Sequence, residues 1–251
     1  MGSAKVTNIA HRGASSYSPE NTFAAFDLAK SMGVKDIELD VHFTNDDHIV
    51  VIHDERVDRT TDGSGHVREM TLEKIRSLDA GAWFASEFTA EPIRTLGEVL
   101  ERYKDDLKFH IEIKARDAPG LAARTCDLVR GYGVTDTTTI TSFHKQWLVE
   151  SRKYAPEIPT GWLVPLGPGS LWKDDIIEQA LEEDFSQVCP RAELISTALV
   201  NTLHSHGFEV RCHGVFNEDL MIRVINSGAD GMTVNFPDKL RQYLITKGLA
   251  N

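Results

Sequence analysis

Apolar and polar positions alternate along residues 36–42, which read Asp-Ile-Glu-Leu-Asp-Val-His. In a strand, side chains point alternately to two faces, so Glu38 and Asp40 share one face, with their roots about 6 to 7 Å apart. The apolar residues between them point the other way, as in a strand that is covered by helices. The pattern therefore predicts a strand that presents two carboxylates side by side.

Strand-like and helix-like patterns then alternate along the whole chain. Strands are expected at 6–10, 36–42, 108–114, 139–143, 159–163, 187–190, 208–212 and 230–234. Helical patterns lie between them, at 120–132, 145–154, 174–183, 196–204, 218–227 and 238–246, and a Thr95-x-x-Glu98 capping box opens another helix. About eight strand–helix units in one chain of this length favour an α/β fold, the (β/α)8 TIM barrel. A doubly wound open sheet is the alternative, but no Gly-x-Gly-x-x-Gly follows the first strand and no second domain is indicated.

Two segments need separate treatment. Ser18-Pro-Glu-Asn21 is typical of a helix start, with Ser18 as N-cap and proline in the first turn, and predicts a helix that runs to Gly33. Residues 55–92 break the alternation and predict a small insertion after the second strand unit, which follows the β-branched run at 48–52. The insertion has turn residues, a brief helical stripe and three aromatic residues expected to pack it against the main body: Trp83, Phe84 and Phe88.

Composition indicates an ordinary globular protein and excludes several partners. With 251 residues, of which 41% are hydrophobic and 26% charged, we expect a single barrel domain over 1–251. The net charge of −11 and the lack of Lys/Arg runs disfavour nucleic acid and stable membrane association. Three dispersed cysteines suggest buried thiols in a reducing compartment. With no signal sequence and no long apolar run, we expect a cytoplasmic protein.

A barrel carries its chemistry on the loops at the carboxyl ends of its strands. Those ends bring a set of polar residues to one rim: His11, Glu38, Asp40, His53, Glu112 and Lys114. Three carboxylates without a His-Glu-x-x-His or cysteine pair favour one hard divalent cation, Mg2+ or Ca2+, over zinc. Lys114, together with Arg12 beside the flexible Gly13, favours binding of a phosphate. His11 and His53 can serve as general acid and base. Together these features are typical of a phosphoryl-transfer site.

A series of motifs carries a family resemblance. In chain order they are Ala10-His-Arg-Gly13, Ser18-Pro-Glu-Asn-Thr22, Ile37-Glu-Leu-Asp-Val41, Val51-Ile-His-Asp54, Arg59-Thr-Thr, Ile111-Glu-Ile-Lys114, Thr141-Ser-Phe143 and Gly228-Ala-Asp-Gly231 with Pro237-Asp238. The sequence resembles the glycerophosphodiester phosphodiesterases over almost its whole length. The resemblance implies a (β/α)8 barrel with an insertion at about 55–92. It also implies that Glu38, Asp40 and Glu112 hold the cation, that His11 and His53 are the acid–base pair, and that Arg12 and Lys114 hold the phosphate.

Two motifs depart from the family pattern. Gly214-Val-Phe-Asn217 stands where the family commonly has Trp-Thr-Val-Asn, and Val234-Asn-Phe-Pro237 stands where it has Thr-Asp-x-Pro. We expect these changes to affect the wall of the pocket, and so the alcohol that is accepted. A replacement wall could come from the aromatic residues Phe143, Trp162 and Trp172, although core or lid packing is the expected role of each.

The expected reaction is hydrolysis of small glycerophosphodiesters, the deacylated phospholipid head groups, to sn-glycerol 3-phosphate and an alcohol. Attack by water and attack by the neighbouring glycerol hydroxyl, through a cyclic phosphate, are both compatible with the residues. Two other functions remain open from the sequence. One is a metal-dependent lyase of phospholipid or sphingolipid esters that yields a cyclic phosphate. The other is a barrel that binds glycerophosphodiesters without turnover, which the presence of both histidines disfavours.

Overall fold

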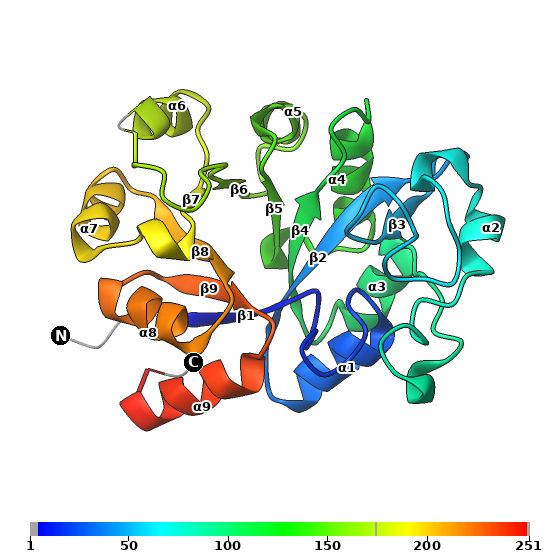
Figure 1. The fold of residues 1–251 in the computed structure, drawn as a ribbon. Coiled ribbons are helices and arrows are strands. Elements are labelled where there is room, and N and C mark those ends of the chain that lie inside the picture. Colours follow the sequence, from blue (N-terminus) through cyan, green and yellow to red (C-terminus); the bar gives the residue numbers. More distant parts are fainter. Residues whose placement is uncertain (1–4, 174, 250–251) are drawn as a thin grey trace.

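The barrel predicted from the sequence is present. The computed structural model describes residues 5–173 and 175–249. Within them a nine-stranded sheet runs in the order β1-β9-β8-β7-β6-β5-β4-β2-β3 and closes through pairing of β1 with β2 (Figure 1). The eight parallel strands of the barrel are β1 (Thr7–His11), β2 (Asp36–Phe43), β4 (Lys108–Ile113), β5 (Thr138–Ser142), β6 (Thr160–Leu163), β7 (Gln187–Cys189), β8 (Glu209–Val215) and β9 (Gly231–Val234). Because β1 pairs with both β9 and β2, the sheet has no open end, which excludes the doubly wound alternative.

Helices surround the barrel and follow the predicted segments closely. They are α1 (Phe23–Ser31), α3 (Leu96–Tyr103), α4 (Leu121–Gly131), α5 (Lys145–Tyr154), α6 (Asp175–Glu182), α7 (Thr197–Ser205), α8 (Glu218–Ser227) and α9 (Pro237–Lys247). Short 3-10 helices lie at Val67–Glu69, Ser86–Phe88, Thr135–Thr137 and Ala192–Leu194. The capping box predicted at Thr95 and Glu98 forms at the start of α3. No helix of the described residues is long and apolar enough to span a bilayer.

The main core lies between the strands and this ring of helices. On β2, Ile37, Leu39 and Val41 are fully buried in one cluster with Phe26 of α1 and Leu100 of α3. Burial of each such side chain stabilises the fold by roughly 1.5 to 3 kcal/mol. Because the outward face of β2 is fixed by this packing, the polar side chains of the strand must face the barrel interior.

The start of α1 differs from the prediction. The helix begins at Phe23, and its N-cap is Thr22, whose hydroxyl accepts a hydrogen bond from the backbone N–H of Ala25. Ser18 was therefore wrong as N-cap. The reason is local: Asn21 has a left-handed backbone (φ 59°), which cannot continue a helix, and its side chain donates to Asp40. Residues 18–21 thus form a loop that serves the barrel interior.

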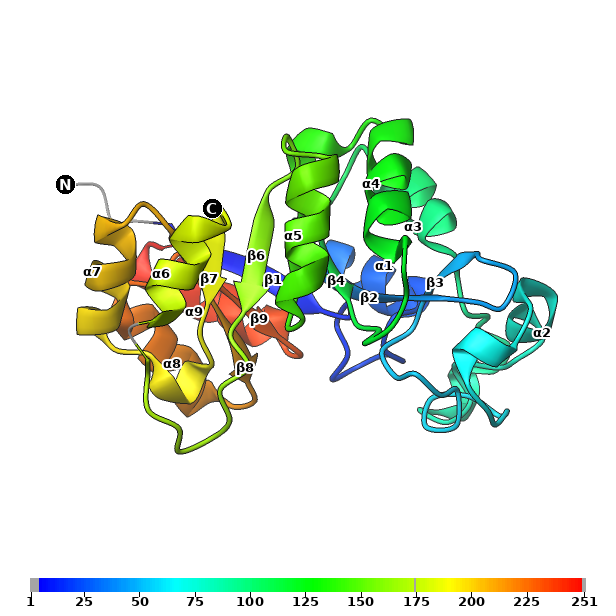
Figure 2. The ribbon, with the colours of Figure 1, turned by 90° about the horizontal axis from the view of Figure 1, so that it is seen from above.

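The insertion is a distinct lobe beside the barrel. Strand β3 (Ile49–Val51) follows β2 and pairs with it in antiparallel orientation. The lobe comes after β3 and carries the short helix α2 (Leu72–Arg76), which lies at one side of the barrel in Figure 2. The lobe and its edges have their own buried cluster of Val50, Ile52, Val57, Val67, Ile75, Leu78, Ala80 and Ile93. Trp83, Phe84 and Phe88 are not in this cluster and instead stack edge to face on one another. The lobe is packed by aliphatic residues. None of the three aromatics belongs to the main core or packs against it, so the expected anchoring to the main body was wrong.

Candidate active site

Strand register brings the three predicted carboxylates together inside the barrel. In the pairing of β2 with β4, Asp40 lies opposite Glu112, and in the pairing of β1 with β2, His11 lies opposite Glu38. One carboxylate oxygen from each of Glu38, Asp40 and Glu112 lies within 4.8 Å of the others, and all three residues are buried. Carboxylates that are 74 positions apart in the sequence therefore meet at one point, as the alternating patterns predicted.

The cluster fits a hard cation. Glu38 Oε1 and Asp40 Oδ1 are buried and have no hydrogen-bond partner among the described residues. The second oxygen of each is oriented by the protein, since Glu38 Oε2 accepts from the backbone N–H of Arg12 (3.1 Å) and Asp40 Oδ2 from the amide of Asn21 (2.9 Å). Buried oxygens without a donor are costly unless something pairs with them. An all-oxygen donor set of this kind suits Mg2+ or Ca2+.

The carboxyl groups of the cluster have unlike affinities for protons. Burial and the neighbouring Asp40 raise the pKa of Glu38 well above its ordinary value. Burial raises the pKa of Glu112 to about 7, although Lys114 acts in the opposite direction. Burial also acts to raise the pKa of Asp40, but Arg12, His53 and Lys114 outweigh it and hold that pKa below the ordinary value. When no cation is bound, protonation of carboxyl groups in the cluster therefore reduces the repulsion among the three acids.

Two basic residues flank the cluster. Lys114 Nζ lies 2.8 Å from Glu112 Oε1 and 4.0 Å from Asp40 Oδ1. The Arg12 guanidinium lies 3.2 Å from Asp40 Oδ2 and 2.9 Å from Glu20 Oε1, so it forms ion pairs with both carboxylates. Arg12 also lines the cavity. The next residue, Gly13, has φ 83°, and a Cβ there would lie 2.6 Å from the backbone of Ala25. Glycine is required for this turn to pack under α1.

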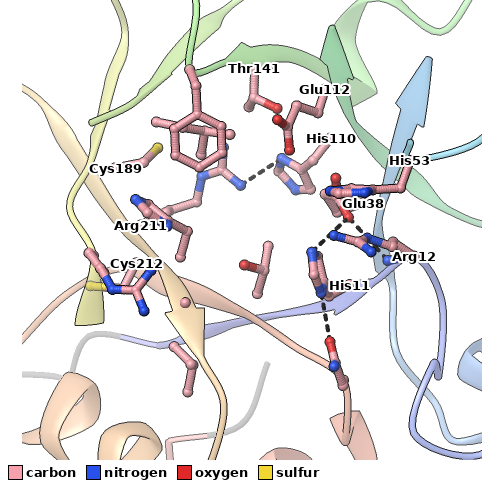
Figure 3. Close-up of a pocket in the computed structure, with 18 of the residues that line it drawn as sticks. His11, Arg12, Glu38, His53, His110, Glu112, Thr141, Cys189, Arg211 and Cys212 are labelled. Carbon is pink, nitrogen blue, oxygen red and sulfur yellow. Dashed lines mark hydrogen bonds and ion pairs between the residues drawn. The ribbon is translucent and has the colours of Figure 1, made fainter. Parts of the chain in front are cut away.

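His11 stands at the end of β1 and is held by a neutral amide. Its Nδ1 lies 2.6 Å from Asn235 Oδ1, so Nδ1–H donates to the amide oxygen and Nε2 is left toward Glu38, 3.8 Å from Oε2. Burial, with a contribution from Arg12, lowers the pKa of His11 to about 4. The imidazole is therefore neutral at physiological pH, and one nitrogen faces the cluster with a free lone pair (Figure 3).

His53 is held by a carboxylate instead. Its Nδ1 lies 2.5 Å from Asp54 Oδ1, and Asp54 Oδ2 accepts from Arg59 Nε at 2.6 Å. Arg59 in turn donates to Glu20, which also pairs with Arg12. Hydrogen bonds from Arg59 and His53 lower the pKa of Asp54 to about 2, although burial acts to raise it. A continuous series of hydrogen bonds and one ion pair, between Arg12 and Asp40, thus connects the insertion to the carboxylate cluster.

Several functional side chains were not predicted from the sequence. Asn21, Asp54 and Glu20 lie inside motifs that were identified from the sequence. Catalytic or binding roles were predicted for other residues and not for these three. Asn235 was noted only as a departure from the family pattern that affects the pocket wall, whereas the structure shows it bonded to His11. The available signal was its position, directly after the last strand and therefore at the same rim as His11.

The cluster opens into a cavity of about 210 Å³ within the barrel. Arg211 and His110 also line it and are joined by a hydrogen bond from Arg211 Nη1 to His110 Nδ1 of 2.7 Å (Figure 3). The wall is formed by side chains that include Phe143, Arg191, His213 and Phe216. Of the three aromatics considered as a replacement wall, Phe143 lines this cavity. Trp162 is buried in the core and Trp172 packs against it.

Comparisons with known proteins agree with this geometry. Residues 11–239 match the family model of the Glycerophosphoryl diester phosphodiesterase family. A glycerophosphodiester phosphodiesterase of Caldanaerobacter subterraneus subsp. tengcongensis is 38% identical over 97% of this chain and 99% of its own. One of Bacillus subtilis is 32% identical over 93% and 85%, respectively. A phosphodiesterase structure from Oleispira antarctica, in complex with the product sn-glycerol-3-phosphate, superposes with a TM-score of 0.86, at 28% identity over 96% of this chain and 97% of that one.

Proposed function

Because the chain belongs to the glycerophosphoryl diester phosphodiesterase family, and so among the phosphoric diester hydrolases, we propose that it hydrolyses glycerophosphodiesters with the help of one divalent cation. The products are sn-glycerol 3-phosphate, the molecule held by the Oleispira antarctica enzyme, and a free alcohol. The observation that carries this proposal is the meeting of three buried carboxylates, two of whose oxygens lack a hydrogen-bond donor among the described residues, between two oriented imidazoles.

Charge balance supports the proposal. Three carboxylates face the cations of Arg12 and Lys114, so the fully ionised cluster has one negative charge in excess. A divalent cation held by Glu38, Asp40 and Glu112 changes this excess to one positive charge. A phosphodiester carries a single negative charge at neutral pH, so a bound cation would lower the electrostatic cost of placing it beside three carboxylates.

The residues around the cluster have separable roles in this proposal. The cation, when bound, supplies Lewis acidity toward the non-bridging phosphoryl oxygens. Lys114 stabilises the charge that grows on those oxygens, and Arg12 orients Asp40 and contributes positive potential to the phosphate position. Both cations are already in place before the substrate arrives, so little reorganisation is needed during the reaction.

His11 and His53 are the proposed acid–base pair. Each uses Nδ1 for its own support, Asn235 in one case and Asp54 in the other, so each leaves Nε2 for the substrate. One imidazole, neutral and with a lone pair on Nε2, takes the proton of the attacking hydroxyl, and the other, protonated at Nε2, gives that proton to the departing alkoxide and is left neutral. A binding protein needs neither this pairing nor the supports behind it, which favours turnover over capture.

The test begins with dialysed protein and glycerophosphodiesters, with release of sn-glycerol 3-phosphate followed by a coupled assay. Excess chelator and the variant Glu38→Gln should each abolish release of sn-glycerol 3-phosphate. Added Mg2+ or Ca2+ should restore the activity of the wild-type protein but not that of the variant. Glu178→Gln, an exposed position on α6, is the matched control and should behave as wild type. Full turnover in excess chelator contradicts the metal role. Phosphorus NMR of the product separates the possible reactions, since a stable cyclic phosphate would indicate a lyase.

A further inference from the structure

A second, more open cleft adjoins the catalytic residues on the side of the insertion. We call it the insertion groove, and its volume is about 580 Å³. It is lined by His42, His53, Asp54, Glu55, Arg56, Asp58, Arg59, His66, Lys114, Arg116 and His144. His53 and Lys114 also line the barrel cavity, so the two spaces meet at the position proposed for the phosphate.

The two spaces suit different parts of the substrate. Every glycerophosphodiester has the same glycerol, whereas the alcohol varies in size and charge. The barrel cavity is the smaller and less open of the two, and it is lined by Thr141 and Thr233, whose side chains make no hydrogen bond among the described residues, so it fits a small polyol. The groove is larger, polar and open to solvent, so it accepts groups of different length.

The charges in the groove narrow the choice of alcohol. Most of them are paired: Arg56 with Asp58, and Arg59 with Asp54. Glu55 and Arg116 are exposed and make no ion pair with any described residue. Both line the groove together with His144. One free anion and one free cation are therefore available to a ligand.

From this arrangement we infer that the insertion groove binds the alcohol half of the substrate and favours an alcohol with both an ammonium and a carboxylate, as in glycerophosphoserine. The inference rests on the proposed function and names its substrate class. The guanidinium of Arg116 matches a carboxylate in a bidentate manner, and Glu55 accepts from the ammonium. Choline is disfavoured, because a quaternary ammonium is held best by aromatic faces and the groove lining has no Phe, Tyr or Trp.

The experiment measures kcat/KM for four diesters: those of serine, ethanolamine, glycerol and choline. In the wild-type protein, the serine ester should exceed the choline ester by about tenfold or more. Arg116→Gln should lower kcat/KM for the serine ester by about five- to tenfold, mainly through KM, and leave the glycerol ester within about twofold. Glu55→Gln should lower kcat/KM for the serine and ethanolamine esters and leave kcat/KM for the glycerol ester unchanged. Lys153→Gln, an exposed position on α5 outside the groove lining, is the control.

The possible outcomes separate the inference from the proposal beneath it. A loss in Arg116→Gln that is selective for the serine ester supports the assignment. An equal loss for all four diesters overturns it, because Arg116 then acts on the phosphate or the glycerol. Four unchanged values also overturn it. If the wild-type protein releases sn-glycerol 3-phosphate from none of the diesters, the proposed function itself fails, and the groove assignment fails with it.

Discussion

Replacement of Glu112 by glutamine should stabilise the metal-free protein while it removes activity. The pKa of Glu112 is raised from the ordinary 4.5 to about 7, chiefly by burial. A raised pKa in an acid means that ionisation is penalised in the folded state, so stability is lost as pH rises from about 4.5 to about 7. A difference of about 2.5 pKa units corresponds to about 3 kcal/mol above that range. Glutamine keeps the shape and cannot ionise, so it avoids this cost.

The assay is thermal unfolding in chelator between pH 4 and pH 8. In a protein of this size, about 3 kcal/mol corresponds to a rise in Tm of about 6 to 12 °C. The difference in Tm between Glu112→Gln and wild type should be near zero at pH 4, increase between pH 4.5 and pH 7, and stay constant at higher pH. Added Mg2+ or Ca2+ should raise the Tm of the wild type far more than that of the variant. A variant that melts below wild type at pH 8 in chelator would refute the crowding argument.

Two further predictions concern the imidazoles. His11→Ala and His53→Ala should each lower kcat by about 10²- to 10⁴-fold with little change in metal-induced stabilisation, which comparison of steady-state kinetics with melting curves in Mg2+ can check. Asn235→Leu, which removes the acceptor for His11 Nδ1–H, should lower kcat by roughly 10- to 100-fold while KM changes little, and Asn235→Asp should recover much of that loss. Equal kcat in the Leu variant and wild type would show that the amide does not orient His11.

The barrel and the meeting of its carboxylates could be predicted because both follow from strand periodicity. Once residues 37, 39 and 41 are assigned to the buried outer face, Glu38 and Asp40 must face inward, and strand register then fixes their distance from Glu112. These are short-range rules that apply along the whole chain. The same rules identified His11 and Lys114 as rim residues.

Contacts between loops could not be predicted in this way. Serine is a favoured N-cap residue, so Ser18 predicted an earlier helix start. In the structure Asn21 bonds to Asp40 and Glu20 bonds to Arg12, and these contacts outweigh the local preference. The bond between Asn235 and His11 joins residues 224 positions apart. Aromatic residues in the insertion indicated burial, but the aliphatic side chains of Val57, Val67 and Ile75 fill its core instead. Which side chains meet across loops depends on tertiary packing that periodicity does not encode.

The route of the chain through the insertion allows the lobe to change in length without disturbing the barrel. The chain leaves the barrel at β3 and returns beside it, because Val50 forms a β-bridge with Thr95 and Val51 N–H donates to the carbonyl of Arg94. With its ends already adjacent, a twofold change in the length of this lobe costs only about 0.6 kcal/mol of closure entropy. As long as Arg59 is kept to support Asp54, the outer lobe can be shortened or extended while the carboxylates of the barrel stay in place.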